Sequence, residues 1–225
     1  MARECSKAVR RRMGDSEFVA RYFVGRGLDV GPGPDPLMLY MDVFPKIAGL
    51  DHFDRPQGDA QLLDGIADES YDFLHSSHCL EHLRDCFTGI RNWFRVIRPG
   101  GYLIVTVPDE DLYEQGQFPS TFNSDHKWTF TIYKRQSWCD RSVNLFNLIL
   151  GLGETAEIKR LVQIETGYRY DIPRFDQTLT PFAESAIEFV VRKRSPQEIS
   201  AGGRMPGPGQ LSTIEAILLT GVKPD

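Results

Sequence analysis

The sequence predicts an α/β fold in which a mostly parallel sheet is covered by helices on both faces. Short apolar runs alternate with helical stretches through the first half of the chain, an order that is typical of parallel sheets. A Gly-x-Gly turn, Gly31 and Gly33, directly follows the first of these runs. About twenty residues later, Asp51 ends a second apolar run. This layout is typical of a nucleoside site at the carboxyl edge of the sheet.

The elements follow in order along the chain. Residues 6–23 are expected to form an amphipathic helix, since their apolar side chains recur at helical spacing. The clearest later helix spans residues 86–97 and is ended by Pro99-Gly100-Gly101. Strands are expected in four apolar runs, at residues 27–30, 46–51, 71–76 and 101–107.

The second half of the chain is expected to add one helix and two strands. Residues 144–150 read as part of a helix, and residues 158–164 and 186–191 read as a final antiparallel pair of strands. Residues 206–209, Pro-Gly-Pro-Gly, indicate a flexible segment. The apolar run at residues 214–219 is ambiguous, because it could dock on the core or on a partner chain.

The glycine turn favours a nucleoside without phosphates. Pro32, Pro34 and Pro36 lack backbone N–H groups, whereas a pyrophosphate needs several such donors at the start of a helix. Pro36 also stands where a dinucleotide site needs a small residue. NAD and FAD are therefore disfavoured, and no Gly-Lys-Ser/Thr follows that would hold a nucleoside triphosphate.

Over residues 24–110 the chain resembles the class I S-adenosylmethionine-dependent methyltransferases. Five features carry the resemblance, in the family's order and spacing: residues 28–33 (LDVGPG), Asp51, residues 58–63 (GDAQLL), residues 71–77 with 80–82 (YDFLHSS and LEH), and residues 98–105 (RPGGYLIV). The resemblance implies a Rossmann-like seven-stranded sheet with an antiparallel last strand. It also implies one domain over residues 1–225, with an N-terminal helix (1–23), a cofactor-binding half (24–110) and a substrate-side half (111–225).

The resemblance implies S-adenosylmethionine as cofactor. Asp29 would lie near its ammonium group, Asp51 would bond the ribose, and Asp59 would bond the adenine. Each acid also has an ordinary interpretation, as a structural cap, a turn acid or a helix N-cap. The full set of expected cofactor contacts is Asp29, Gly31, Gly33, Asp51, His52, Asp59, Ala60 and Ser76.

Composition narrows the class of protein. The chain has 225 residues, 41% of them apolar, and a net charge of −5, so one good core is expected and nucleic acid is not an expected partner. The run Arg10-Arg11-Arg12 is interpreted as a solvated helix face. Four cysteines follow no disulfide or zinc-ribbon spacing, which favours a reduced cytoplasmic protein. No signal peptide or membrane-inserted segment is expected.

Methyl transfer to a hydroxyl group benefits from a base, whereas a free amine needs none. His126, preceded by Asp125, is the predicted base, because this segment follows the fifth strand and should hang over the acceptor entrance. The alternative is a surface loop with a satisfied histidine. His78 is predicted to lie near the methyl group. No metal is expected, although residues 78–82 spell H-x-x-E-H, which on a helix would suggest a zinc peptidase.

Four residues are predicted to bind the acceptor. Trp128 is suited to stack on a sugar ring, although it could equally belong to the core. Tyr168, Arg169 and Arg174 could hold an anionic group, or the arginines could pair with nearby acids. The segment around His126 also resembles, more loosely, loops of bacterial methyltransferases from glycan-assembly clusters.

The predicted function is methylation of a hydroxyl on a sugar or another small polar molecule. The alternatives are a small-molecule N-methyltransferase and a non-catalytic cofactor-binding partner subunit, and a homodimer is a further expectation.

Overall fold

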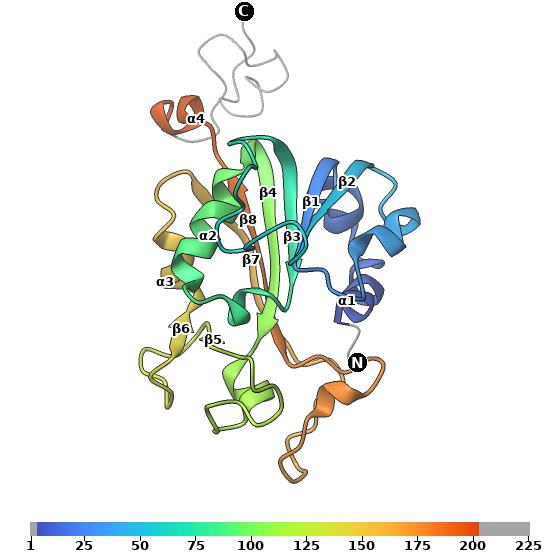
Figure 1. The fold of residues 1–225 in the computed structure, drawn as a ribbon, viewed down its shortest axis with the longest axis vertical. Helices are drawn as coiled ribbons and strands as arrows, with labels where there is room; N and C mark the ends of the chain where they lie inside the picture. The colour runs from blue at the N-terminus through green and yellow to red at the C-terminus, as the bar shows by residue number, and fades with distance from the viewer. Residues whose placement is uncertain (1–3, 203–225) are drawn as a thin grey trace, which may run out of the picture.

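A six-stranded sheet runs through the centre of the computed structural model, which describes residues 4–202. The strand order is β2-β1-β3-β4-β8-β7 (Figure 1). Strands β1 to β4 are parallel, β8 is antiparallel to β4, and β7 is antiparallel to β8. The strands are β1 (Gly25–Val30), β2 (Ile47–Phe53), β3 (Tyr71–Ser77), β4 (Ile97–Pro108), β7 (Ala156–Ile164) and β8 (Ala186–Lys193).

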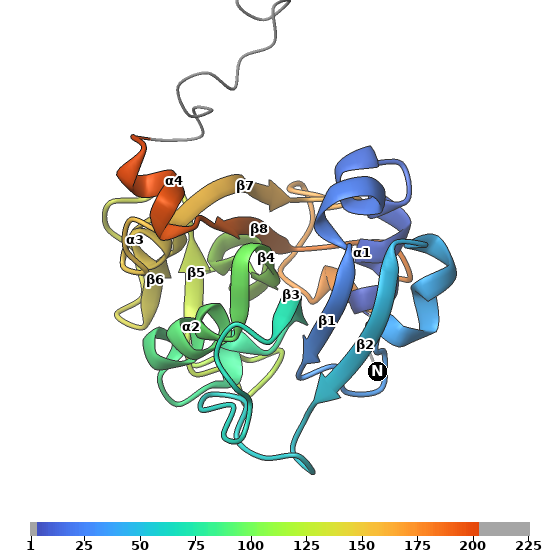
Figure 2. The ribbon, with the colours of Figure 1, turned by 90° about the horizontal axis from the view of Figure 1, so that it is seen from above.

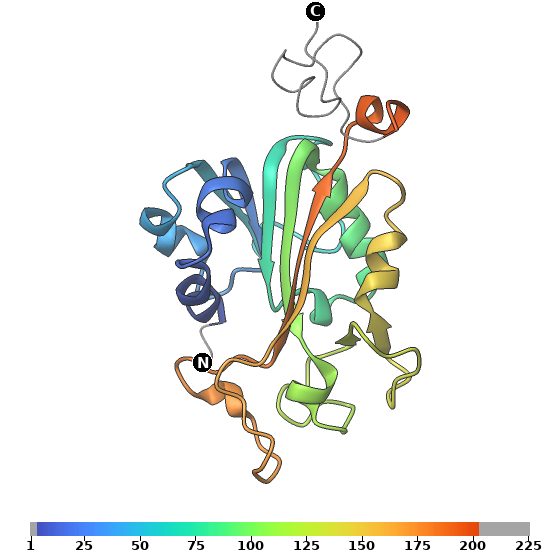
Figure 3. The ribbon, with the colours of Figure 1, turned by 180° about the vertical axis from the view of Figure 1, so that it is seen from behind.

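Helices cover both faces of this sheet, as predicted (Figure 2). On one face lie α1 (Glu4–Arg12) and two helical turns, Phe18–Tyr22 and Leu37–Val43. On the other face lie α2 (Cys86–Arg95) and α3 (Leu145–Leu150). Figure 3 shows the two groups from behind, on opposite sides of the central strands.

Each face has its own apolar core. Phe23 lies in the core beneath α1, and Trp93 of α2 lies in the other. Successive side chains of β4 alternate between them: Ile104 enters the first core, while Leu103 and Val105 enter the second. All three are fully buried, which explains why this strand is continuously apolar.

The N-terminal helix is shorter than expected. Helix α1 ends at Arg12, and a separate π-helical turn follows at Phe18–Tyr22. Between them lie Gly14, which favours helix ends, and Asp15, whose side chain accepts a hydrogen bond from the Glu17 N–H. The periodic apolar pattern is therefore shared by two short elements instead of one long helix.

The central sheet has one strand fewer than predicted. The chain between Phe53 and Tyr71 forms turns, so β2 is the edge of the sheet. Pro56 has no N–H to donate, and Gly58 and Leu63 both adopt positive φ angles, which prevents a regular ladder beside β2. A separate two-stranded sheet pairs β5 (Thr129–Thr131) with β6 (Ser142–Asn144).

A buried polar network joins α1 to the sheet. Arg12 is fully buried and donates hydrogen bonds to Glu188 of β8 and Thr106 of β4. It also contacts His75 Nε2 at 3.1 Å, while His75 Nδ1 lies 2.7 Å from Asp29 Oδ1. Because arginine can only donate, His75 Nε2 accepts from Arg12 and Nδ1–H donates to Asp29. This network fixes Asp29 at the end of β1.

The last described element is α4 (Pro196–Ser200), which begins with a capping box between Ser195 and Glu198. The expected flexible segment at 206–209 and the apolar run at 214–219 lie outside the described residues. None of the helices described here is long and apolar enough to span a membrane.

Candidate active site

Two adjoining cavities open at the carboxyl ends of the parallel strands. The segments 110–126 and 166–183 hang beyond this edge, at the lower end of Figure 1, close to the start of α1. The cavities measure about 350 and 560 Å³, within the range of small-molecule sites. They share the lining residues Gly31, Gly33, His78, His82 and Asn123 and therefore form one continuous groove.

The glycine turn forms the middle of the groove. Gly31 has φ +65°, and a Cβ atom there would lie 2.4 Å from Cys79 Sγ, so only glycine fits. Gly33 has φ +54° with no atom within 4 Å of a Cβ position, which leaves room for a ligand against the backbone. The Gly33 N–H donates to Asp54 Oδ2 at 3.0 Å.

Asp29 lines the groove with its side chain already engaged. One carboxylate oxygen accepts from the Leu37 N–H at 2.8 Å and the other from His75. Asp29 is 2% exposed. The structure therefore supports the structural-cap interpretation of this acid, alongside its position next to the predicted cofactor.

Asp51 lies away from the groove. It pairs with Leu28 in the register of β1 and β2, and its carboxylate contacts Arg26 at 2.6 Å and the Tyr71 hydroxyl at 2.9 Å. Asp51 lines neither cavity. β2 runs two residues further than predicted, to Phe53, so the acid that emerges beside the glycine turn is Asp54.

The remaining predicted cofactor residues are divided. Asp59 and Ala60 line the larger cavity, although Asp59 also pairs with Arg84 and accepts from the Gln61 N–H. His52 is exposed and lines a neighbouring hollow beside Asp29 and Gly33. Ser76 is fully buried, and its hydroxyl donates to the Val30 carbonyl between two strands, so it does not reach the groove.

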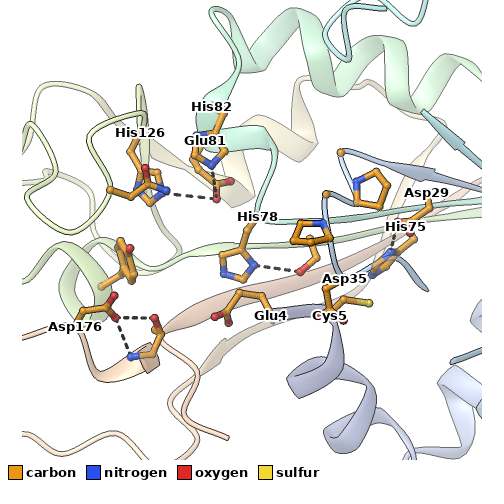
Figure 4. Close-up of a pocket in the computed structure, with 18 residues that line it drawn as sticks. Glu4, Cys5, Asp29, Asp35, His75, His78, Glu81, His82, His126 and Asp176 are labelled. Carbon is orange, nitrogen blue, oxygen red and sulfur yellow. Dashed lines mark hydrogen bonds and ion pairs between the residues drawn. The ribbon is translucent and has the colours of Figure 1, made fainter. Parts of the chain in front are cut away.

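His126 lies at the wall of the smaller cavity, as Figure 4 shows. Its Nδ1 lies 2.7 Å from Glu114 Oε1, and its Nε2 points to Glu81 Oε1 at 4.0 Å. Burial alone would lower the pKa of His126, but the hydrogen bond to Glu114 and the charges of Glu81 and Glu114 outweigh it and raise the pKa. Glu114, rather than the predicted Asp125, therefore orients this ring.

Asp125 instead contacts a second histidine, His82. Its side chain is 54% exposed and contacts His82 Nδ1 at 3.1 Å and Lys127 Nζ at 3.0 Å. His82 Nε2 then faces Glu81 Oε1 at 3.8 Å. Glu81 is fully buried, and burial raises the pKa of its carboxyl group.

His78 lines both cavities. Its φ is +55°, and it lies outside the short 3-10 turn Leu80–His82. The H-x-x-E-H letters therefore do not form the helical zinc-peptidase arrangement. Burial lowers the pKa of His78 to about 3, so its ring is neutral.

The four predicted acceptor residues lie outside both cavities. Trp128 packs against the core, stacks under Arg141 at 4.0 Å and donates to the Leu83 carbonyl. Arg169 pairs with Asp171, as the alternative interpretation has it. Arg174 bonds the Glu114 carbonyl and Thr121, linking the two overhanging segments. Tyr168 stacks edge-on against Tyr170.

Sequence reasoning missed several groove residues. Asp176 and Thr178 come from the predicted acceptor loop, and Glu4 comes from the start of α1. Asp54 was within reach of the sequence, because it follows Asp51 by three positions in the same run. Glu114 carries no motif, since its role depends on the turn Glu110–Glu114 folding back onto His126.

A sequence model of the methyltransferase domain matches residues 2–141, more than half of the chain. The chain belongs to this methyltransferase family. No curated protein matches this chain in sequence.

Solved structures show the same fold. A candidate methyltransferase from Bacillus halodurans has 14% identity and a TM-score of 0.56, covering 83% of this chain and 99% of its own. An S-adenosylmethionine-dependent methyltransferase from Archaeoglobus fulgidus has 16% identity and a TM-score of 0.54, covering 85% and 95%. The [4+2]-cyclase SpnF, at 18% identity and a TM-score of 0.51, covers 83% and 81%. The methyltransferase fold is thus Rossmann-like, and its reaction must be argued from the site.

Proposed function

We propose that this methyltransferase takes its methyl group from S-adenosylmethionine, bound along the groove. The observation that carries the proposal is the continuity of the two cavities across Gly31 and Gly33. The adenosine would occupy the larger cavity beside Asp59 and Ala60, with Asp54 at the ribose. The methionine end would occupy the smaller cavity.

The turn suits this ligand chemically. The space beside Gly33 is open, so a ligand could approach the protein backbone closely there. The adenosine of S-adenosylmethionine carries no phosphate and needs no phosphate-binding donors. Asp29 and Asp35 line the cavity that would receive the cationic sulfonium and ammonium groups. Their negative charge favours this end of the ligand.

We propose that the acceptor is a hydroxyl on a sugar or another small polar molecule. A lone pair on the acceptor oxygen would form the new O–CH₃ bond as the S–CH₃ bond breaks. The electron pair of the S–CH₃ bond would go to sulfur, leaving S-adenosylhomocysteine. The hydroxyl proton would pass to His126 Nε2. With Nδ1–H held by Glu114 at 2.7 Å, Nε2 carries the free lone pair that a base needs.

The first test is a calorimetric titration with S-adenosylhomocysteine, with NAD as the control ligand. We expect one-to-one binding of the first and none of the second. Absence of S-adenosylhomocysteine binding would overturn the cofactor assignment. A screen of hydroxyl acceptors then follows, in which His126→Ala is expected to reduce turnover about 10²-fold or more; turnover within a few-fold of the unaltered protein would remove His126 as the base.

A small-molecule amine is the second candidate acceptor. Five carboxylates line the smaller cavity, namely Glu4, Asp29, Asp35, Glu81 and Asp176. This charge favours a cationic molecule, and an amine that has lost its proton needs no base. Methylation of amines with a rate unaffected by His126→Ala would favour this candidate over the hydroxyl acceptor.

A further inference from the structure

The groove contains a convergent cluster of which the methyl-transfer proposal uses only His126. One potential ligand atom from each of Glu81, His82 and His126 lies within 4.8 Å of the other two. Among residues 4–202, these three side chains form a group that could hold a metal ion. Figure 4 shows the three side chains turned toward a common point. They come from two separate segments, the turn after β3 and the loop before β5.

Both rings present the same nitrogen to this point. His126 Nδ1 contacts Glu114 Oε1, and His82 Nδ1 contacts the Asp125 carbonyl and carboxylate, which are acceptors. Each Nδ1 therefore carries the proton and donates it, so each Nε2 offers its lone pair to the cluster. Hydrogen bonds of this kind orient metal-binding histidines and fix their tautomer.

The third member is a buried acid without hydrogen bonds. Glu81 is fully buried, and neither of its carboxylate oxygens has a hydrogen-bond partner within the described part of the chain. Leaving a buried carboxylate unpaired is strongly unfavourable in a protein interior. A cation bound between Glu81 and the two rings would remove that cost.

The spacing agrees with ligands around an ion better than with direct ion pairs. Glu81 Oε1 lies 3.8 Å from His82 Nε2 and 4.0 Å from His126 Nε2, too far for hydrogen bonds. Donors bonded to one tetrahedral ion at about 2.0–2.1 Å lie about 3.3 Å apart. These two separations exceed the expected value by about 0.5 and 0.7 Å, so small side-chain movements would bring the three groups to one ion.

We propose that Glu81, His82 and His126 bind a divalent transition-metal ion, with Zn²⁺ as the best-matched ion. Two neutral imidazoles and one carboxylate are the ligand set of catalytic zinc sites, which keep a further position open. The open position faces the cavity, where an acceptor oxygen can bind. The same set also accepts Fe²⁺, so Zn²⁺ and Fe²⁺ are separate arms of the test.

The ion's role rests on the proposed function. A hydroxyl bound to the ion becomes more acidic, so the ion would activate the hydroxyl in the metal-bound protein. His126 would act as the base only in protein without the ion, since a bound ion occupies its Nε2 lone pair. The proton would leave to solvent through the open cavity, and the oxygen would attack the methyl carbon as described above. This proposal departs from the prediction drawn from sequence, which expects no metal.

The test is metal titration of chelator-treated protein, followed by elemental analysis. We expect one Zn²⁺ per chain. His82→Asn and His126→Ala should weaken binding by about 10²-fold or more, and Glu114→Gln by about 10-fold to 10²-fold, because Glu114 only orients a ligand. The matched control is His78→Ala, which removes a histidine from the same cavity but outside the cluster and should leave the stoichiometry at one.

Substitution with Co²⁺ supplies a readout that excludes the cysteines. The expected visible spectrum shows tetrahedral nitrogen and oxygen ligands without a thiolate charge-transfer band. A thiolate band would assign the ion to a cysteine instead and overturn the proposal. Binding of neither Zn²⁺ nor Fe²⁺, or binding that survives both histidine substitutions, would also overturn it.

The two proposals fail separately. S-adenosylhomocysteine is titrated into the same samples. Cofactor binding without metal binding overturns the metal site alone and shows that the protein is folded. Metal binding without cofactor binding overturns the proposed donor and leaves the metal site standing.

Discussion

At the scale of single residues, the position of a carboxylate along β2 decides whether it can reach a ribose. Asp51 sits within the strand and pairs with Arg26, whereas Asp54 emerges one residue past its end, against the Gly33 N–H. Because side chains at the carboxyl ends of parallel strands face the ligand crevice, we propose Asp54 as the acid that bonds the ribose hydroxyls.

The matched pair Asp54→Ala and Asp51→Ala tests this placement. We expect Asp54→Ala to weaken S-adenosylhomocysteine binding about tenfold to a hundredfold, the loss expected for hydrogen bonds to a charged group. Asp51→Ala should change affinity by less than a few-fold, because it removes an exposed ion pair with Arg26 and a hydrogen bond from the Tyr71 hydroxyl, both outside the groove. Calorimetry measures both, and the reverse ranking would restore the ribose role to Asp51.

Two glycines of the turn should respond differently to alanine. Gly31→Ala places a Cβ within 2.4 Å of Cys79 Sγ, whereas Gly33→Ala meets no atom within 4 Å. Both carry the cost of about 1 kcal/mol for a left-handed backbone. We expect a clearly lower Tm for Gly31→Ala, and for Gly33→Ala a small change in Tm with weakened S-adenosylhomocysteine binding.

Thermal unfolding and ligand titration of both variants separate the two effects. Equal losses of Tm in the two variants would contradict the expectation that Gly31 is required by packing and Gly33 by ligand binding.

The same scale shows what a sequence can specify about a site. Gly31, Gly33, His78 and His126 line the groove as predicted, because each lies at a strand end or in a loop that the strand order directs there. Trp128 does not line the groove, because its side chain packs against α2. No local sequence pattern predicts this contact.

At the scale of elements, α1 and β8 are joined through charge in the interior. Burial alone would raise the pKa of Glu188, but the charges and hydrogen bonds of Arg12 and Arg11 outweigh it and lower the pKa to about 2. An exposed-face interpretation of Arg10-Arg11-Arg12 is thus wrong for Arg12, which is fully buried.

This attachment predicts an acid-sensitive stability. Because the folded pKa of Glu188 is below its ordinary value, its contribution is present above about pH 4.5 and is lost as the pH falls toward about 2. The full effect is on the order of 3 kcal/mol. Urea unfolding from pH 7 to pH 2 should give Glu188→Gln a lower stability at pH 7 and a shallower loss over this window.

The control for this series is Glu17→Gln, which breaks an exposed pair with Arg21. It should follow the unaltered protein at every pH. A Glu188→Gln curve parallel to the unaltered protein would contradict the assignment.

The elements themselves were largely predictable. β1, β3 and α2 lie within two residues of their expected bounds, since each combines an apolar run with a clear turn or cap. The N-terminal helix was not, because Asp15 can end one helix locally while the apolar period continues into the next turn. The described sheet has six strands, one fewer than the resemblance implies, and Pro56 and Gly58 interrupt the chain beside β2.

At the scale of the whole molecule, the sheet builds the proposed donor side of the groove, and the segments beyond the sheet build the proposed acceptor side. Periodicity predicts the first, whereas contacts between distant loops, such as Arg174 with Thr121, determine the second. This division explains why the family was evident in the sequence and the acceptor was not.

A ligand that bridges the groove should stabilise the molecule as a unit. At a concentration of about 100 times its Kd, S-adenosylhomocysteine should add about 2.7 kcal/mol, which raises the Tm by several degrees in a chain of this length. NAD at the same concentration should leave the Tm unchanged. A thermal-shift series measures both, and equal shifts would contradict selective nucleoside binding.

The pairing of Arg12 with Glu188 also has a consequence during synthesis on the ribosome. The two residues are 176 positions apart, so α1 leaves the exit tunnel long before β8 supplies the carboxylate that neutralises the charge of Arg12. Until then Arg12 cannot be buried at low cost. The His75–Asp29 pair then lacks the hydrogen bond that Arg12 donates to His75. Nascent chains released before residue 188 should therefore be poor at capturing the donor, although every residue of the glycine turn has already been made.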